Sequence, residues 1–329
     1  MIARFMVAAL AMLPPESVDA TFGVESPAYV AIRAVLSVSL IGLLGILSLR
    51  LVVLPRAARQ TSSGRPTQFG EVERKLNGSA RVLLWIIGAF TVARLAAQHA
   101  AFFGTQEPWS RSTLGALIMN SNWGRGWWLA LAATAVGLFG ERQIRRARAF
   151  GWHALAAASV ALTASMAMSG HAAAASTMAM LIHALHVLGA GGWIGSLAAL
   201  MLVAVPTVLR SGGADRHGQI AALVRAFSPA ALAFAGLLAI TGAIEAWRNI
   251  GFIAGLWQAR YGHVLLVKLA LLSVAAGTGT YNWKRVLPSL GSEASTARLR
   301  TSAAVELASA MAVLIVTAVL AATPMPGDN

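Results

Sequence analysis

The 329-residue chain is too apolar and too poorly charged to be an ordinary soluble protein. Hydrophobic residues make up 57% of it and charged residues 12%, whereas a soluble domain carries about 25% charged residues. Apolar runs of about 18 residues or more, long enough to cross a bilayer as helices, recur along the whole length. The composition therefore predicts an all-α, polytopic membrane protein embedded in the lipid bilayer.

The net charge of +14 and the absence of cysteine narrow the function further. A single basic patch would indicate nucleic-acid binding, but the basic residues are spread over alternate connections between apolar runs. That pattern sets membrane topology and argues against a nucleic-acid partner. Without cysteine there are no disulfides and no thiolate ligands. A soft-metal site would have to use His and Met.

Eight apolar segments predict eight transmembrane helices. They are Tyr29–Leu54, Ser79–Phe103, Trp123–Gly140, Phe150–Ser169, Thr177–Leu209, Pro229–Trp247, His263–Tyr281 and Ser302–Thr323. The fifth is long enough to tilt or to end early at Pro206. Residues 1–28 contain only a short apolar run and are expected to form a periplasmic interfacial segment, with a signal peptide as the alternative. Residues 29–169 and 170–329 then form two four-helix halves.

The distribution of lysine and arginine predicts the orientation. Connections 55–78, 141–148, 210–227 and 282–301 carry sixteen of these residues, whereas the opposite set carries four: Arg4, Arg111, Arg248 and Arg260. Basic connections stay on the cytoplasmic side of a membrane. Both termini are therefore expected outside, in the periplasm of a bacterium whose inner membrane holds the chain.

Histidine and methionine gather near the expected outer surface, mainly in the stretch Ser169–Leu200. His183 and His186 are three residues apart and share a helix face. Imidazole and thioether are ligands that suit copper, and thioether favours Cu(I). We predict a metal site drawn from His99, His171, His183, His186, Met168 and Met178. Taken singly, each histidine is also explained by a hydrogen-bonded ring and each methionine by packing.

Charged residues inside the predicted spans need partners or a function. Arg94 lies in the outer half of the second span, Glu245 near the outer end of the sixth and Lys268 in the seventh. Glu245 and Lys268 are expected to form a structural ion pair, with a proton or cation relay as the alternative. Glu306, near the inner end of the eighth span, is a relay candidate or extends to the inner headgroups. Gly191 and Gly195 form a small-xxx-small pattern that lets neighbouring helices approach closely.

Several segments carry a resemblance to a known family. They are SGHAAA at 169–174, HALHVLGAGGWIGSLAAL at 183–200, RAFSPAALAFAGLLAITGAIEAW at 225–247, YGHVLLVKLALL at 261–272 and YNWKRVLP at 281–288. In this order they resemble the copper resistance protein D (CopD) family of bacterial inner-membrane proteins, strongly from Gly170 onward and mostly in topology before it. The positions carried over are His171, His183, His186, Trp193, Gly262, Lys268 and Glu306.

The resemblance implies copper handling beside a separate periplasmic CopC-like copper chaperone, and no enzymatic activity. The first hypothesis is therefore import of copper, as Cu(I), from periplasm to cytoplasm through His and Met sites in the outer half of the bundle. A second hypothesis is a membrane redox protein that holds haem b between His99 and either His183 or His186. A third is a factor that delivers copper to a membrane enzyme.

Overall fold

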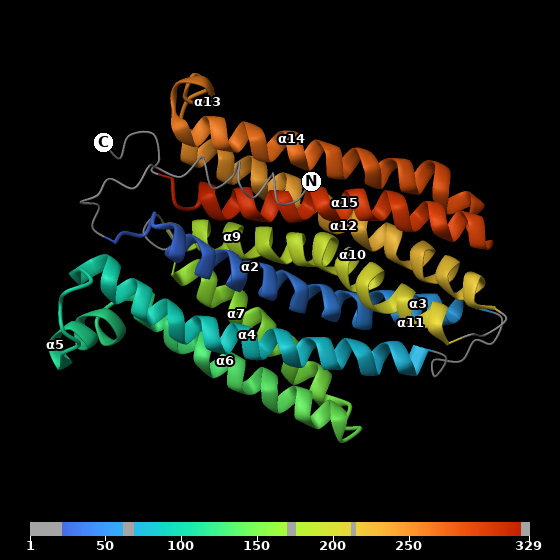
Figure 1. The fold of residues 1–329 in the computed structure, drawn as a ribbon, viewed down its shortest axis with the longest axis horizontal. Coiled ribbons are helices and arrows are strands. Elements are labelled where there is room, and N and C mark those ends of the chain that lie inside the picture. Colours follow the sequence, from blue (N-terminus) through green and yellow to red (C-terminus); the bar gives the residue numbers. More distant parts are fainter. Residues whose placement is uncertain (1–21, 62–68, 170–175, 212–214, 324–329) are drawn as a thin grey trace.

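The computed structural model describes residues 22–61, 69–169, 176–211 and 215–323, and this part of the chain is helical with no strand (Figure 1). The helices run along the long axis of the molecule and connect at its two ends. Their bounds are α2 (Pro27–Ser48), η1 (Leu49–Val53), α3 (Leu54–Arg59), α4 (Gly70–Phe103), α5 (Arg111–Leu114), η3 (Gly115–Met119), α6 (Asn122–Arg145), α7 (Phe150–Met168), α9 (Thr177–Ala190), η4 (Gly191–Gly195), α10 (Ser196–Ala199), η5 (Leu200–Ala204), α11 (Val205–Arg210), α12 (Arg216–Ile250), α13 (Gly255–Gln258), α14 (Arg260–Tyr281), η6 (Asn282–Val286), η7 (Leu287–Ser289) and α15 (Glu293–Leu320).

Seven helices in the described residues are long and apolar enough to cross a membrane. The chain is thus an all-α membrane bundle, as its composition predicts. Of the eight expected spans, α6 is the one that is not apolar enough to count among these seven. It nevertheless forms where expected and packs on α4 and α7. Its first turns contain Arg125 and three tryptophans, which lower its mean hydropathy. The predicted interfacial segment at the N-terminus lies outside the described residues, apart from its last few positions.

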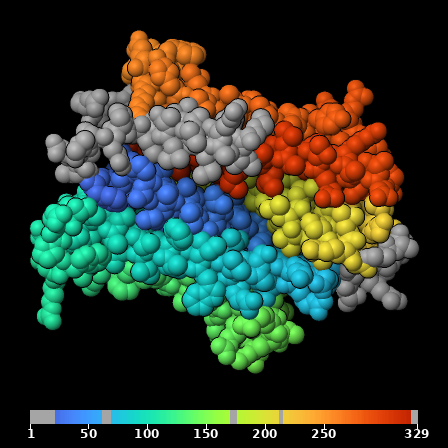
Figure 2. Space-filling view, viewed as in Figure 1, coloured from blue at the N-terminus to red at the C-terminus, as the bar shows by residue number. Residues whose placement is uncertain are grey.

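The centre of the bundle is built from α2 and the helix that runs from α9 to α11. Figure 1 shows α4, α6 and α7 on one side of this centre and α12, α14 and α15 on the other, and α2 appears between α4 and α15 in Figure 2. A Cβ on Gly45 would lie only 1.9 Å from the Gly195 carbonyl carbon, and one on Gly195 would lie 2.0 Å from the Ile41 oxygen. Backbone therefore meets backbone here, which confirms the close approach predicted from the small-xxx-small pattern.

Three wide, π-helical turns lie just before a proline. They are η1 before Pro55, η5 before Pro206 and η6 before Pro288. Proline lacks an N–H and its ring clashes with the carbonyl four residues earlier, and a wider turn separates the two groups. The expectation that the fifth span ends early at Pro206 is therefore wrong: the helix continues to Arg210.

Several helices begin earlier than the apolar segments predict. Helix α4 begins at Gly70 where Ser79 was expected, and α12 begins at Arg216 where Pro229 was expected. Helix α15 begins at Glu293 where Ser302 was expected. Hydropathy marks only the apolar part of a helix, whereas a polar cap adds further turns; Ser292 starts α15 with a capping box. As a consequence Glu306 is the fourteenth of the 28 residues of α15, at mid-helix and not near its inner end.

Candidate metal site between α9 and α12

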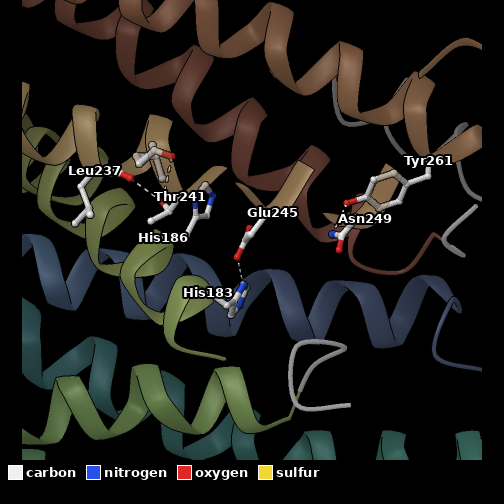
Figure 3. Close-up of polar contacts among 8 residues, drawn as sticks. His183, His186, Leu237, Thr241, Glu245, Asn249 and Tyr261 are labelled. Carbon is white, nitrogen blue, oxygen red and sulfur yellow. Dashed lines mark hydrogen bonds and ion pairs between the residues drawn. The ribbon is translucent and has the colours of Figure 1, made fainter. Parts of the chain in front are cut away.

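His183 is held by a carboxylate from a neighbouring helix. The hydroxyl of Ser176 caps α9 by accepting from the Ala179 N–H at 3.1 Å, and His183 follows one turn later. Its Nδ1 lies 2.9 Å from Glu245 Oε1 on α12 (Figure 3). A carboxylate only accepts hydrogen bonds, so Nδ1 carries the hydrogen. The Nε2 atom of His183 is then left with a lone pair.

His186 is held in the same way by a hydroxyl on α12. Its Nδ1 lies 3.1 Å from Thr241 Oγ1, and that hydroxyl lies 2.7 Å from the Leu237 carbonyl oxygen (Figure 3). A carbonyl only accepts, so when the hydroxyl hydrogen goes to Leu237 the hydroxyl oxygen accepts from Nδ1. This assignment also leaves Nε2 of His186 with its lone pair.

Both imidazoles thus follow the pattern of metal-binding histidines, in which one nitrogen donates to a carboxylate or another oxygen and the other faces the metal. Small residues bring α9 and α12 close enough for these bonds. A Cβ on Gly189 would lie 3.0 Å from the Leu238 nitrogen, and one on Gly242 would lie 3.0 Å from His186 Cε1. The geometry therefore provides two imidazoles of α9, each held at Nδ1 by an oxygen of α12.

Glu245 has a different principal partner from the one predicted. The expected ion pair with Lys268 is not among the ion pairs of the described residues, where Glu245 pairs with His183. Lys268 is half-buried on α14 and interacts with Glu245 and His186 only electrostatically, over a longer distance. The site therefore contains two histidines, one carboxylate and one nearby ammonium group.

The structure does not bring His99 to this pair. His99 is 2% exposed, its Nε2 lies 3.3 Å from Thr113 Oγ1, and its ring stacks on Trp109 at 4.5 Å between centroids. These partners belong to α5 and the segment before it. Among the described residues, no three His, Cys, Asp or Glu side chains are close enough together to hold a metal ion. Nothing here favours the haem arrangement between His99 and α9.

The remaining predicted ligands lie at the same end of the bundle or outside the described part. Met168 is half-buried as the last residue of α7, and Met178 is 62% exposed in the first turn of α9. His171 lies outside the described residues. No contact joins these methionines to the histidine pair, and their roles stay predictions.

Arg94 caps a helix end in the structure. Its guanidinium donates to the carbonyl of Ser169, the residue that closes α7, at 3.2 Å, and it lies over the Trp123 ring at 5.4 Å. Arg33 on α2 does the same for Ala321 at the end of α15, also at 3.2 Å. Cations at helix C-termini are favoured by the helix dipole. This geometry gives Arg94 a structural role.

Trp193, a position carried over by the family resemblance, and Glu306, a relay candidate, meet inside the bundle. Glu306 is 4% exposed, accepts from Asn282 Nδ2 at 3.1 Å and lies near enough to Trp193 to interact with it. The expectation that its carboxylate extends to the inner headgroups is wrong, because the side chain is buried at mid-helix. Asn282 and Thr241 are the polar partners that the sequence analysis missed. Thr241 was detectable, since it precedes Glu245 by four residues and shares its helix face.

Fold and site together define a polytopic, all-α membrane protein with a histidine pair between two of its helices. Residues 24–180 match the model of the copper resistance protein D-like N-terminal domain, and residues 221–320 match that of copper resistance protein D. The two matches cover most of the chain, which belongs to the CopD family and is thus a copper-resistance membrane protein. The resemblance seen in the sequence is confirmed and extends to the first half. No curated protein and no solved structure matches the chain.

Proposed function

We propose that this protein imports copper, as Cu(I), from the extracytoplasmic side of the bacterial inner membrane through the histidine pair of α9. One observation carries the proposal: Nδ1 of both His183 and His186 is held by an oxygen of α12, which leaves both Nε2 atoms for a metal ion. Two imidazoles, with no third His, Cys, Asp or Glu grouped with them in the described part of the chain, suit copper in a low coordination number. Membership in the CopD family supports copper as the cargo.

The orientation proposed is eight spans with both termini outside. The ends of the helices support it: α3 and α4, α6 and α7, α11 and α12, and α14 and α15 connect at one end of the bundle (Figure 1). These are the basic connections, and the rule that basic loops stay inside assigns that end to the cytoplasm. The start of α9 lies at the other end, so the histidine pair is closer to the outer surface. A separate CopC-like chaperone would deliver copper there.

The test is copper accumulation by cells that express the wild type or a His183→Ala, His186→Ala double variant. We expect accumulation to fall to the level of cells without the protein, because both Nε2 ligands are lost. Cu(I) binding by the detergent-purified proteins, measured by competition with a chromophoric Cu(I) chelator, should be lost in parallel.

His263→Ala is the matched control, since His263 is an exposed histidine on α14 with no part in the pair. Its accumulation and binding should equal those of the wild type at matched amounts of protein in the membrane. Equal accumulation by the wild type and the double variant would contradict import. If the purified wild type still bound Cu(I) in that case, the same pair would serve delivery of copper to a membrane enzyme.

A further inference from the structure

The inner half of the bundle contains a buried carboxylate without a cation. Glu141 and Glu306 are the two buried carboxylates of the described residues, 2% and 4% exposed. Glu141 forms an ion pair with Arg145, Nε to Oε1, at 2.9 Å. None of the ion pairs in the described part of the chain involves Glu306. An ionised carboxylate buried in an apolar interior without a cation is strongly unfavourable.

The groups that face Glu306 are neutral and come from two neighbouring helices, α14 with η6 and the helix that contains η4. The side-chain amide of Asn282 in η6 donates to Glu306 Oε2 at 3.1 Å. The side-chain carbonyl oxygen of Asn282 accepts from the Ser302 hydroxyl of α15. Trp193 of η4 lies near enough to interact with the carboxyl group. On α14, Gly279 leaves room beside Oε1, because a Cβ there would lie 3.0 Å from that oxygen. The site therefore positions the carboxyl group without compensating its charge.

The charged groups of the packed helices are directed elsewhere. Lys268 of α14 interacts with Glu245, and Arg33 of α2 reaches the Ala321 carbonyl. At the basic end of α12, α14 with η6, and α15 lie Arg216, His217, Arg225, Lys284, Arg285, Arg298 and Arg300, all exposed or half-buried; Arg248, Arg260 and His263 are exposed at the opposite end of α12 and α14. His217 is bonded to Thr296 of α15 at 3.0 Å. No fixed cation in the described part of the chain pairs with Glu306. The negative charge of its carboxylate must therefore be balanced by a small mobile cation.

The turn that carries Trp193 links this carboxyl group to the histidine pair. Unlike η1, η5 and η6, the wide turn η4 has no proline near its end. It follows directly on α9, so His186 and Trp193 are separated by seven residues of one continuous helix. Wide turns without a local sequence cause are frequent at functional sites. Here the turn carries the indole of Trp193, which interacts with Glu306.

We propose that Glu306, held by Asn282 and Trp193, is an intramembrane proton-binding site, and that its proton is exchanged for copper bound at His183 and His186. The coupling rests on the proposed copper site; the proton site itself does not. Arrival of a Cu⁺ at the neutral imidazoles and loss of a proton from the Glu306 carboxyl group to water at the cytoplasmic end leave the charge of the interior unchanged. No electron is transferred in this exchange.

The proton site is tested by infrared spectroscopy of the copper-free, detergent-purified protein. We expect the carbonyl stretch of a protonated carboxylic acid in the wild type and its loss in Glu306→Gln. Glu141→Gln is the matched control, because it removes a buried carboxylate that is already paired with Arg145, and it should leave the band unchanged. The absence of the band in the wild type, or its persistence in a folded Glu306→Gln variant, would overturn the proposal.

The coupling is tested with proteoliposomes that contain a pH-sensitive dye. Cu(I) addition should release protons inside wild-type vesicles. Glu306→Gln should release none and, because coupling between two sites is reciprocal, should bind Cu(I) more weakly than the wild type. Trp193→Phe, which keeps the ring but removes the N–H, should reduce the release at least severalfold while Cu(I) stays bound. Unchanged release in both variants would overturn the coupling. If the His183→Ala, His186→Ala variant bound Cu(I) normally, the proposed function would fail, and the infrared band alone would decide the proton site.

Discussion

The hydroxyl of Thr241 has a single hydrogen, and the structure directs it to the Leu237 carbonyl. With the hydroxyl hydrogen on Leu237, Nδ1 of His186 donates to that hydroxyl, which keeps Nε2 as the free nitrogen. The orientation of one potential metal ligand thus depends on a neutral side chain that touches no metal. Such outer hydrogen-bond partners typically influence metal affinity strongly.

Thr241→Val should weaken Cu(I) binding by about tenfold or more, the effect usual for loss of such a partner. Valine has the shape of threonine but accepts no hydrogen bond, so Nδ1 of His186 loses its acceptor and the ring is no longer fixed in one tautomer. Competition with a chromophoric Cu(I) chelator on the purified variant measures the change.

The matched control is Thr134→Val on α6, another buried threonine whose hydroxyl donates to a carbonyl one turn earlier, that of Ala130. Its Cu(I) affinity should be that of the wild type. An unchanged Cu(I) affinity in a folded Thr241→Val variant would show that the tautomer of His186 does not matter for binding.

At the residue level, the sequence predicted positions along each helix better than it predicted partners. Spacing placed His183 and His186 on one face, and they do face α12 together. Depth alone suggested His99 as a companion and Lys268 as the partner of Glu245, because hydropathy gives the height of a residue in a helix and not its direction. The ring of His99 is instead covered by Trp109, through a connection whose course the sequence pattern did not reveal.

At the level of helices, the contact between α2 and η4 places the histidine helix in the middle of the bundle. Gly45 and Gly195 meet backbone to backbone, and Gly191 leaves no room for a Cβ beside Leu44. The small-xxx-small pattern predicted such a contact, whereas the wide turns η1, η5 and η6 could not be predicted from hydropathy. Proline marks where a helix needs an adjustment, but it does not say whether the helix ends or widens.

Gly45→Ala should destabilise the protein by about 1–3 kcal/mol or more, the usual cost of extra volume in a well-packed interior. The new Cβ would lie 1.9 Å from the Gly195 carbonyl carbon, so α2 and η4 must separate. The melting temperature of the detergent-purified protein should fall. Gly78→Ala on α4 is the control, because a Cβ there meets nothing within 4 Å and alanine favours a helix over glycine. A melting temperature for Gly45→Ala at or above the wild-type value would contradict this contact.

At the level of the whole molecule, the number of spans depends on α6. Its 24 residues correspond to a length of about 36 Å at 1.5 Å per residue, enough for a hydrocarbon core of about 30 Å. Its amino-acid composition is less apolar than that of the other seven helices. If α6 did not cross the membrane, every later helix would be inverted, and the histidine pair would lie near the cytoplasmic surface.

The natural absence of cysteine allows a direct test with single cysteines and a membrane-impermeant maleimide on whole cells. With eight spans, Thr105→Cys and Gln258→Cys should be labelled, whereas Gln60→Cys and Ala149→Cys should react only after lysis; all four positions are exposed. With seven spans the labelling of Ala149→Cys and Gln258→Cys would be reversed, while Thr105→Cys and Gln60→Cys would keep their pattern. The two later positions therefore decide the topology, and with it whether His183 and His186 receive copper from outside the cell or from within.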